Sequence, residues 1–287
     1  MSVAITPVLA SAARHGLSVL SALWVIANLC VWLSLLTLSL PFMILLRFID
    51  RQIWLESWIQ WIYQSAVKID SFWMLKVVGI RFEIEGTLPN TKRAIVIANH
   101  QSWFDIPIVQ EIISARGPRL TFLIKDSLAW VPIIGWICLL LGFPRLKRSG
   151  LTSDRAADLH AVEQAAIHSR DTEHALLVFA EGTRFTRTKS IDQNSPYTHL
   201  LRPKVGGLAA ACGIFPKGTP IVDMSIRYEG TSNFWHCLGG ATKTIRIKLS
   251  SHWMDDDFDP KAFLNHCWED KDHFLASNGS HPRQSIV

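Results

Sequence analysis

The sequence has little charge, and near its start it has none over a long stretch. Asp, Glu, Lys and Arg make up 18% of the 287 residues, and apolar residues make up 49%, which leaves ample material for a core. No charged side chain occurs from Gly16 to Leu46, whereas about 20 apolar residues, rising ~1.5 Å each, cross the hydrocarbon layer of a bilayer. We therefore expect this run to lie in lipid.

A cleaved signal peptide is the alternative for this run. Its apolar core would be about twice the usual ~7–15 residues, and no small-x-small cleavage site follows before Pro41 and Arg47. A retained membrane segment is favoured. Arg14 precedes the run, whereas the cations that follow it are Arg47, Arg51, Lys68 and Lys76. This asymmetry predicts that the large domain lies on the cytoplasmic side.

Cysteine is scarce and irregularly spaced. The five cysteines form no Cys-x-x-Cys pair and leave an odd one over, which excludes a disulfide framework and is typical of a reduced compartment. The net charge of +5 is accompanied by no RNP, zinc or basic-helix pattern, so nucleic acid is not expected as a partner. Anionic lipid headgroups are the favoured partner of the positive charge.

Other signatures are missing as well. No Gly-x-Ser-x-Gly elbow occurs, which argues against a serine hydrolase that forms an acyl-enzyme. The acidic residues Asp255, Asp256, Asp257 and Asp259 lack the glycine and glutamate of an EF-hand, so a solvated loop is favoured over a calcium site.

Tryptophan, by contrast, is placed regularly after the apolar run. Between Gln52 and Lys76, the residues Trp54, Trp58 and Trp61 share one helical face. The opposite face carries Glu56, Gln60 and Gln64. This pattern predicts an interfacial amphipathic helix; a helix packed on the domain core is the alternative.

The rest of the chain alternates between strand and helix patterns. The predicted strands are Val77–Glu85, Arg93–Ala98, Leu120–Ile124, Ala175–Phe179, Ile221–Tyr228 and Thr242–Leu249. The predicted helices are Trp103–Ser114, Ser153–Ser169, Lys204–Cys212 and Asp255–Leu275. Strands alternating with helices argue for an α/β sheet.

Two short motifs carry the chemistry, and each begins where a predicted strand ends. In Asn99–Asp105, His100 stands five residues before Asp105, a pairing that can make a histidine a directed general base. In Phe179–Arg184, a glycine permits close backbone approach and Arg184 offers a planar fork for phosphate. Taken singly, the motifs could be a helix cap and a surface turn. Together they indicate acyl transfer to a phosphate-bearing alcohol.

These residues resemble the lysophosphatidic acid acyltransferases (1-acylglycerol-3-phosphate O-acyltransferases), which belong to the glycerolipid acyltransferase superfamily with its His-x4-Asp signature. Asn99–Asp105 is similar to the first family motif, and Phe179–Arg184 to the third, with Ala180 where proline is usual. Lys125–Trp136 resembles the Lys-x2-Leu-x3-Pro-x2-Gly-Trp segment. The second motif corresponds to Gly142–Arg145. The resemblance spans roughly Leu88 to Met224.

Two departures from the family pattern stand out. In the fourth motif, Thr219–Met224, Asp223 stands where a second proline is common. In the second motif, Pro144 precedes Arg145, and Lys147 and Arg148 add two further cations.

The resemblance implies a mixed sheet flanked by helices, with an N-terminal membrane segment in residues 1–76 and an acyltransferase domain in residues 77–287. It implies a metal-free, cofactor-free reaction in which the sn-2 hydroxyl of lysophosphatidic acid attacks the thioester of acyl-CoA or acyl carrier protein. His100 and Asp105 are the implied catalytic pair. The implied substrate-binding residues are Lys125, Arg145, Glu181, Gly182, Thr183, Arg184 and Lys204. A bacterial inner membrane is the implied location. Another lysophospholipid acceptor and a catalytically silent membrane scaffold are the alternatives.

Overall fold

The computed structural model describes residues 5–115, 117–146 and 152–277. Contacts divide the chain into two compact units. Unit 1 comprises Met1–Glu83, Ser102–Ala115 and Tyr228–Arg246, and unit 2 comprises Ile84–Gln101, Arg116–Arg227 and Ile247–Val287. The first unit thus contains the predicted membrane segment together with two later stretches of the chain.

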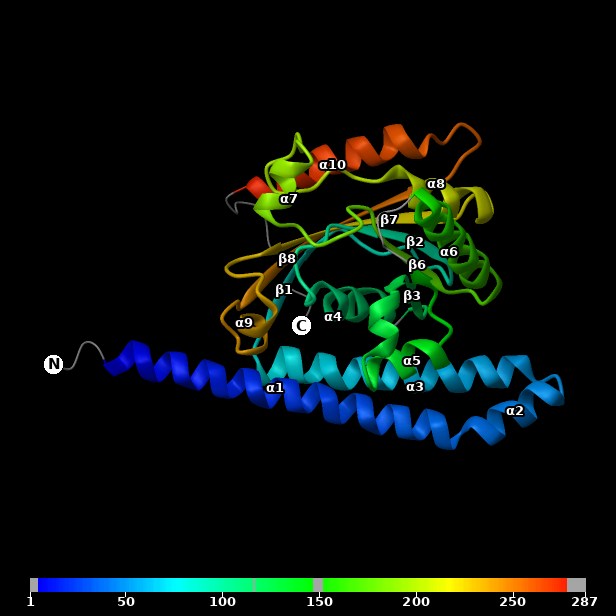
Figure 1. Ribbon diagram of the computed structural model, residues 1–287, viewed down its shortest axis with the longest axis horizontal. Helices are drawn as coiled ribbons and strands as arrows, with labels where there is room; N and C mark the ends of the chain where they lie inside the picture. Colours follow the sequence, from blue (N-terminus) through cyan, green and yellow to red (C-terminus); the bar gives the residue numbers. More distant parts are fainter. Residues whose placement is uncertain (1–4, 116, 147–151, 278–287) are drawn as a thin grey trace. The chain divides into compact units, whose positions relative to one another are not determined.

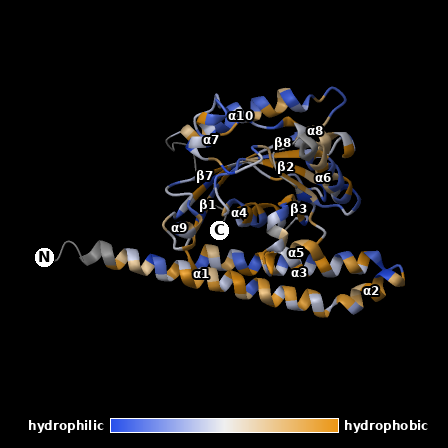
Figure 2. Cartoon of the chain, in the orientation of Figure 1, coloured by the Kyte–Doolittle hydropathy of each residue, from blue (hydrophilic) through white to orange (hydrophobic). Residues whose placement is uncertain are grey.

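Unit 1 begins with α1 (Ile5–Leu38), α2 (Leu40–Phe48) and α3 (Gln52–Phe72), which are joined by short turns (Figure 1). Within α1, the stretch Leu9–Leu38 is long and apolar enough to cross a membrane by length and composition. Hydrophobic residues dominate α1 and α2 (Figure 2). The predicted lipid segment is therefore one long helix that continues into a second, short one.

Polar side chains of α1 bind backbone carbonyls of other helices in unit 1. The Ser18 and Ser21 hydroxyls donate to the carbonyls of Trp235 (2.8 Å) and Leu238 (3.0 Å) in α9 (Phe234–Leu238), and the Asn28 amide donates to a carbonyl of α3. A Cβ on Gly239 would lie 2.5 Å from the Ser18 hydroxyl oxygen, so the glycine allows this close approach. These bonds satisfy polar groups on an otherwise apolar helix.

The tryptophan face of α3 is partly exposed and partly packed on α1 and α2, where Trp61 lies edge-to-face with Trp32 and Trp58 with Phe42. Trp54 and Trp61 are 66% and 51% exposed, and Trp58 stacks on Trp61 with ring centroids 5.3 Å apart. On the other face, the Gln64 amide donates to the Ser114 carbonyl. Polar residues thus face the neighbouring η2 (Gln110–Ser114), which is the arrangement expected of an interfacial helix.

One predicted strand begins too early. Val77–Ile80 do not extend β1 (Arg81–Glu85), because the helix of α3 continues as the π-helical turn η1 (Trp73–Val77). Gly79 then reverses the chain at a φ of +77°. The Lys243 ammonium donates to the Val78 carbonyl (2.7 Å) and fixes this turn.

The main sheet has six strands in the order β1-β8-β7-β2-β6-β3. Its other strands are β8 (Thr244–Trp253), β7 (Pro220–Tyr228), β2 (Ala94–Ala98), β6 (Ala175–Phe179) and β3 (Leu120–Phe122). Strand β2 is buried along its whole length and pairs in parallel with both β6 and β7. Burial on both faces explains why its sequence is a continuous apolar run.

Helices of unit 2 cover one face of this sheet. They are α6 (Thr152–Asp171), α8 (Val205–Ile214) and α10 (Pro260–Ala276) (Figure 1). Their side chains, including Ala165, Leu208 and Trp268, form one buried cluster with residues of the central strands. Strands alternating with helices in the sequence therefore build the predicted α/β layers.

Sequence patterns did not predict several smaller elements of unit 2. A second sheet pairs β4 (Ile124–Lys125) in parallel with β5 (Arg145–Leu146). Between these strands the chain forms η3 (Asp126–Trp130) and α5 (Ile134–Leu140), and α7 (Arg187–Asp192) follows β6. In unit 1, the predicted helix Trp103–Ser114 is divided into α4 (Asp105–Val109) and η2.

The departure in the fourth motif has a partner in the last helix. Asp223, on the central strand β7, forms an ion pair with Lys271 of α10, whose side chain is fully buried. The Lys271 ammonium also donates to the Met224 carbonyl (2.8 Å). A buried carboxylate is tolerable where such a counter-charge meets it.

Candidate active site

The two predicted motifs emerge side by side from neighbouring strands. Ala98, the last residue of β2, is in register with Phe179, the last residue of β6, and these strands run in parallel. Both motifs therefore start at the carboxyl edge of the sheet, where α/β proteins collect their ligand-binding groups. The prediction that each motif begins where a strand ends is confirmed.

Asn99 fixes the first motif to the sheet. Its side-chain amide donates to the Ile226 carbonyl (2.9 Å), and its side-chain oxygen accepts from the Ile226 backbone N–H (2.8 Å). The buried amide thus pairs with β7 as a peptide group of an adjacent strand would. This bidentate contact fixes the backbone immediately before His100.

Three contacts within unit 2 fix the position of His100. Its backbone N–H donates to a carboxylate oxygen of Glu181 (2.8 Å), and its carbonyl accepts from the Phe185 N–H (2.7 Å). Its ring stacks on Phe179, with centroids 4.0 Å apart and planes 16° from parallel. The imidazole is therefore oriented by the neighbouring motif while remaining partly exposed.

Glu181 joins three segments of unit 2. It is fully buried; one oxygen accepts from the His100 N–H, and the other accepts from the Leu201 N–H at 2.9 Å. Two charge-assisted bonds to backbone donors are strong and directional. This geometry favours a positioning role for Glu181 over the direct substrate contact that the resemblance implies.

The rest of the Phe179–Arg184 motif lies beside two lysine side chains. Gly182 has a φ of +71°, and a Cβ there would lie 3.2 Å from the Lys204 ammonium. The Lys189 ammonium donates to the Thr183 hydroxyl (2.8 Å) and to the Arg184 carbonyl (3.1 Å). The structure thus brings the predicted residues Gly182, Thr183, Arg184 and Lys204 together with one unpredicted cation, Lys189.

Asp105 belongs to unit 1, where two donors fix its buried carboxylate. The Ser102 backbone N–H donates to one oxygen (2.8 Å), and the Tyr228 hydroxyl donates to the other (2.5 Å). Burial raises the pKa of Tyr228 well above its usual range, and the Asp105 charge raises it further. The phenol therefore stays protonated and remains a donor to Asp105.

Lys125 and Arg145 lie on the second sheet rather than at the strand ends that carry the motifs. They sit on the paired strands β4 and β5, both are exposed, and the Arg145 guanidinium lies 3.6 Å from the Asp126 carboxylate. The additional cations Lys147 and Arg148 fall outside the described residues. Within the described ranges, no group of three or more His, Cys, Asp or Glu side chains could hold a metal ion.

Comparison with known proteins identifies the family. Residues 79–227 match the Acyltransferase family model, which is more than half of the chain. The chain belongs to the Acyltransferase family. The matched range contains both motifs and both small cation-bearing strands.

Two individual relatives of this Acyltransferase-family chain show how similar it is to known proteins. It is 28% identical over 185 residues to the 1-acyl-sn-glycerol-3-phosphate acyltransferase epsilon of Mus musculus, which covers 59% of this chain and 49% of the relative. It is 27% identical over 197 residues to the 1-acyl-sn-glycerol-3-phosphate acyltransferase of Cocos nucifera, covering 67% and 56%. The chain thus spans about half the length of these curated relatives.

A solved structure supports the fold. The crystal structure of the 1-acyl-sn-glycerophosphate (LPA) acyltransferase, PlsC, from Thermotoga maritima covers 93% of this chain and 100% of its own, with a TM-score of 0.57 and 19% identity. The predicted fold class, a mixed sheet flanked by helices after an N-terminal apolar segment, is confirmed.

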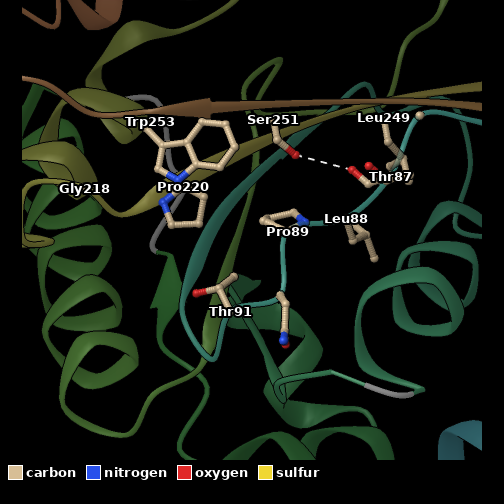
Figure 3. Close-up of a pocket in the computed structure, with 11 residues that line it drawn as sticks. Thr87, Leu88, Pro89, Thr91, Gly218, Pro220, Leu249, Ser251 and Trp253 are labelled. Carbon is tan, nitrogen blue, oxygen red and sulfur yellow. Dashed lines mark hydrogen bonds between the residues drawn. The ribbon is translucent and has the colours of Figure 1, made fainter.

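Two hollows elsewhere on this family member offer no comparable chemistry. One, of about 570 Å³, opens between the segment after β1 and the ends of β7 and β8, and its lining includes Pro89, Pro220 and Trp253 (Figure 3). Pro220 begins β7, so this hollow lies at the opposite end of the parallel strands from the motifs. None of its lining residues is ionisable, so it contains no base.

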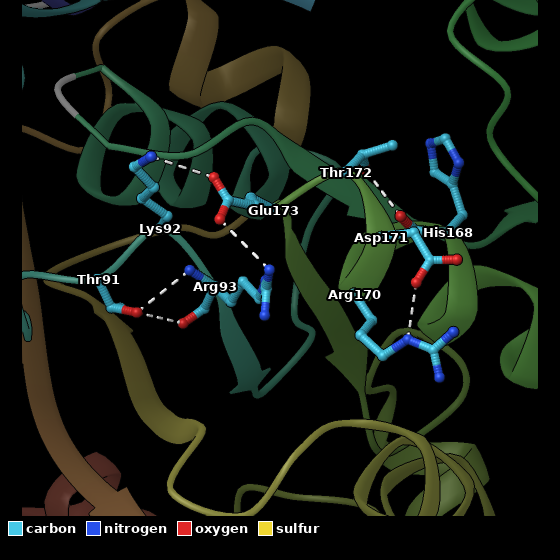
Figure 4. A network of polar contacts seen from close by, with 8 residues as sticks. All are labelled: Thr91, Lys92, Arg93, His168, Arg170, Asp171, Thr172 and Glu173. Atoms are coloured by element: carbon cyan, nitrogen blue, oxygen red, sulfur yellow. Dashed lines mark hydrogen bonds and ion pairs between the residues drawn. The ribbon is translucent and has the colours of Figure 1, made fainter. Parts of the chain in front are cut away.

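The other hollow, of about 520 Å³, is lined in part by Arg93, Arg170 and Asp171. These side chains belong to a surface network in which Arg93 pairs with Glu173 (3.3 Å) and Arg170 with Asp171 (2.7 Å) (Figure 4). At the amino ends of β2 and β6, this network pairs three cations, Lys92, Arg93 and Arg170, with the two carboxylates of Glu173 and Asp171. Exposed ion pairs of this kind contribute little to the free energy of unfolding.

Proposed function

We propose that this protein transfers a fatty acyl chain from acyl-CoA or acyl carrier protein to the sn-2 hydroxyl of 1-acylglycerol 3-phosphate, giving phosphatidic acid. The observation that carries the proposal is the parallel register of Ala98 and Phe179. This register brings the partly exposed histidine next to the glycine turn of the other motif. Cationic side chains lie beside that turn. The family match and the names of the relatives support the same reaction.

In this mechanism His100 acts as the general base and needs neither a metal nor a cofactor. It takes the proton of the sn-2 hydroxyl as the oxygen attacks the thioester carbonyl. The new C–O bond forms, the C–S bond breaks, and the proton passes to the departing thiolate. Asp105, five residues along, orients the imidazole and stabilises its charged form. Glu181 holds the His100 backbone in place.

The acceptor's phosphate is bound by exposed cations in and around the Phe179–Arg184 motif. Arg184 supplies a planar fork for two phosphate oxygens, and Lys204, beside Gly182, supplies a further charge. Thr183 contributes a hydroxyl, while Lys125 and Arg145 are the outer members of the set. Holding the acceptor in reacting geometry can itself lower the barrier by several kcal/mol.

The protein works at a membrane, where α1 provides the anchor and the bilayer provides the acceptor. The proposed location is a bacterial inner membrane with the catalytic residues on the cytoplasmic side, an orientation that the cations following the apolar run support. Another lysophospholipid is the alternative acceptor. A panel of lysophospholipids and both acyl donors, tested on purified full-length protein, distinguishes these substrates.

Replacing the base tests the reaction. His100→Ala is expected to lower thiol release from acyl-CoA in the presence of lysophosphatidic acid by about 10²–10⁴-fold, because base catalysis commonly supplies that factor. His160→Ala, which removes an exposed histidine of α6, is the control. Asp105→Ala added to His100→Ala should cost little more. Near-normal turnover in folded His100→Ala protein would exclude the mechanism.

Replacing Arg184 tests whether its guanidinium binds the phosphate of the acceptor. Arg184→Ala is expected to lower kcat/KM for lysophosphatidic acid by about 10–100-fold, because a lost charge-assisted bond weakens binding by about 1.5–3 kcal/mol. The KM for acyl-CoA should hardly change. Arg187→Ala, which removes an exposed guanidinium at the start of α7, is the matched control. An equal loss with an unphosphorylated acceptor would assign Arg184 a structural role.

A further inference from the structure

Unit 2 exposes an apolar segment between its two short strands β4 and β5. We call Trp130–Leu140 the apolar projection. Trp130 is 79% exposed and Trp136 58% exposed. The other large hydrophobic residues exposed along it are Val131, Ile134, Leu139 and Leu140. An exposed apolar patch of this kind normally marks a surface that binds something.

The helix within the projection is apolar on every side. The sequence of α5, Ile134–Leu140, contains no charged side chain, and its only polar side-chain groups are the indole N–H of Trp136 and the thiol of Cys138. Gly135 and Cys138 form its buried face, whereas Trp136 and Leu139 point to the exposed side. A helix with one face in water would carry polar residues there. The exposed side is therefore built for an apolar environment.

The fold presents this segment in a fixed shape. A Cβ on Gly135 would lie 2.1 Å from the Ala129 carbonyl oxygen, so only glycine lets α5 lie this close to η3. Ile133 holds a φ of +69°, and the Ile134 N–H donates to the Pro132 carbonyl (2.8 Å). A β-branched residue adopts such a backbone only where its surroundings impose it.

Positive charge lies at the base of the projection. Lys125 is the last residue of β4, immediately before η3. Arg145 is the first residue of β5, the next strand after α5 in the chain. Both cations are exposed and stand on paired strands. The Asp126 carboxylate, 3.6 Å from the Arg145 guanidinium, offsets one of the two charges, so one net positive charge remains. Three features of this region match the three layers of a bilayer surface. The apolar side chains suit the acyl chains, the tryptophans suit the interface, and the cations suit the anionic headgroups. This charge complementarity favours a membrane over a second protein.

We propose that the apolar projection inserts into the interfacial layer of the membrane, with Lys125 and Arg145 at the level of lipid phosphates. Unit 2 then contacts the bilayer through its own residues, in addition to the α1 anchor of unit 1. The contact holds the catalytic unit at the surface from which a lipid acceptor comes.

Lipid photolabelling of the unmodified full-length protein tests the contact without requiring turnover. The protein is placed in vesicles of phosphatidylethanolamine and phosphatidylglycerol that contain a lipid with a photoactivatable carbene precursor on its acyl chain, and adducts are located by mass spectrometry. We expect adducts in residues 130–140 as well as in Leu9–Leu38. Trp253 of unit 2, which is also 58% exposed, is the internal control and should carry few. Labelling of Leu9–Leu38 without adducts in 130–140 would overturn the proposal.

A variant pair adds a functional measurement. Trp130→Ser with Leu139→Ser is expected to lower adduct yield in the projection about tenfold. It should lower turnover of a vesicle-borne acceptor several-fold, while turnover of a short-chain, monomeric acceptor is unchanged. Trp253→Ser should change neither. An equal loss on both acceptors in folded protein would contradict a membrane role. Inactivity of the unmodified protein on both acceptors would instead contradict the proposed function and leave the photolabelling result standing.

Discussion

Asp105 accepts hydrogen bonds from two donors of unit 1, the Ser102 backbone N–H and the Tyr228 hydroxyl. The short Tyr228 bond is charge-assisted and buried, which makes it the stronger constraint on the carboxylate. Because its hydroxyl donates to the Asp105 carboxylate, Tyr228 acts as a positioning residue.

Tyr228→Phe should therefore lower kcat about tenfold while leaving the KM of donor and acceptor within about twofold, since a lost hydrogen bond to a charged group is worth about 1.5–3 kcal/mol. Steady-state kinetics measure this split. Adding Tyr228→Phe to Asp105→Ala should have almost no further effect, because both act through one carboxylate. Tyr63→Phe, which removes a buried hydroxyl that accepts from Gln110, is the control. Additive losses in the double variant would make Tyr228 merely structural.

At this scale, local motifs carry the prediction of the chemistry. His100, Asp105 and Arg184 stand in short patterns whose spacing already suggests a base and an anion clamp. Tyr228 is 123 positions from Asp105, and Lys189 reaches Thr183 only because α7 follows the turn. Such contacts depend on strand order and loop path, which residue spacing does not encode.

Among the elements, α10 is joined to the central sheet by the Asp223–Lys271 pair. Lys271→Met should lower the free energy of unfolding by about 3–5 kcal/mol, because it leaves an uncompensated buried carboxylate. Thermal denaturation of detergent-solubilised protein measures the effect. Lys261→Met, at the exposed start of the same helix, should be nearly neutral. Asp223→Val combined with Lys271→Met should recover much of the loss; no recovery would mean that the ion pair is not its cause.

The prediction of helices and strands succeeded where apolar residues form a short, well-bounded run or a clear repeat, and it failed where they do neither. Strand β6 has the bounds that the sequence predicts, and β2 differs by one residue, because both are short buried runs. The run Trp130–Leu140 is apolar almost throughout, so it has no period that distinguishes strand from helix. Val77–Ile80 has strand-like composition, but Gly79 and Lys243 stabilise a turn there.

For the whole molecule, alternating strands and helices were enough to predict the α/β class, and an uncharged run was enough to predict the apolar helix. The division at residue 76 is not the division by contacts, because unit 1 also takes up Ser102–Ala115 and Tyr228–Arg246. Sequence-distant segments such as α9 join α1 through Ser18 and Ser21. Two serines in an apolar run do not reveal that partnership.

The stability of the molecule should depend on pH through Asp70 of α3. Burial raises its pKa from 3.8 to about 7, and a hydrogen bond with Asn28 partly opposes the shift. A carboxyl whose folded pKa is raised favours the folded state at low pH, and this advantage is lost as pH rises from about 4 to 7. Asp70→Asn should therefore stabilise the protein more at pH 8 than at pH 5, by on the order of 2 kcal/mol. Melting temperatures of both proteins at the two pH values measure this; an equal difference at both would contradict it.

The buried pair of Asp223 and Lys271 also sets an order of events during synthesis. The two residues are 48 positions apart, so the ribosome releases the carboxylate well before the ammonium that neutralises it. Until Lys271 emerges, Asp223 stays hydrated or takes up a proton, because an unpaired charge resists burial. The native packing of α10 on β7 therefore waits for the last part of the chain. The apolar α1 is made long before that point, so a nascent chain presents its apolar helix well before this part of the core can form.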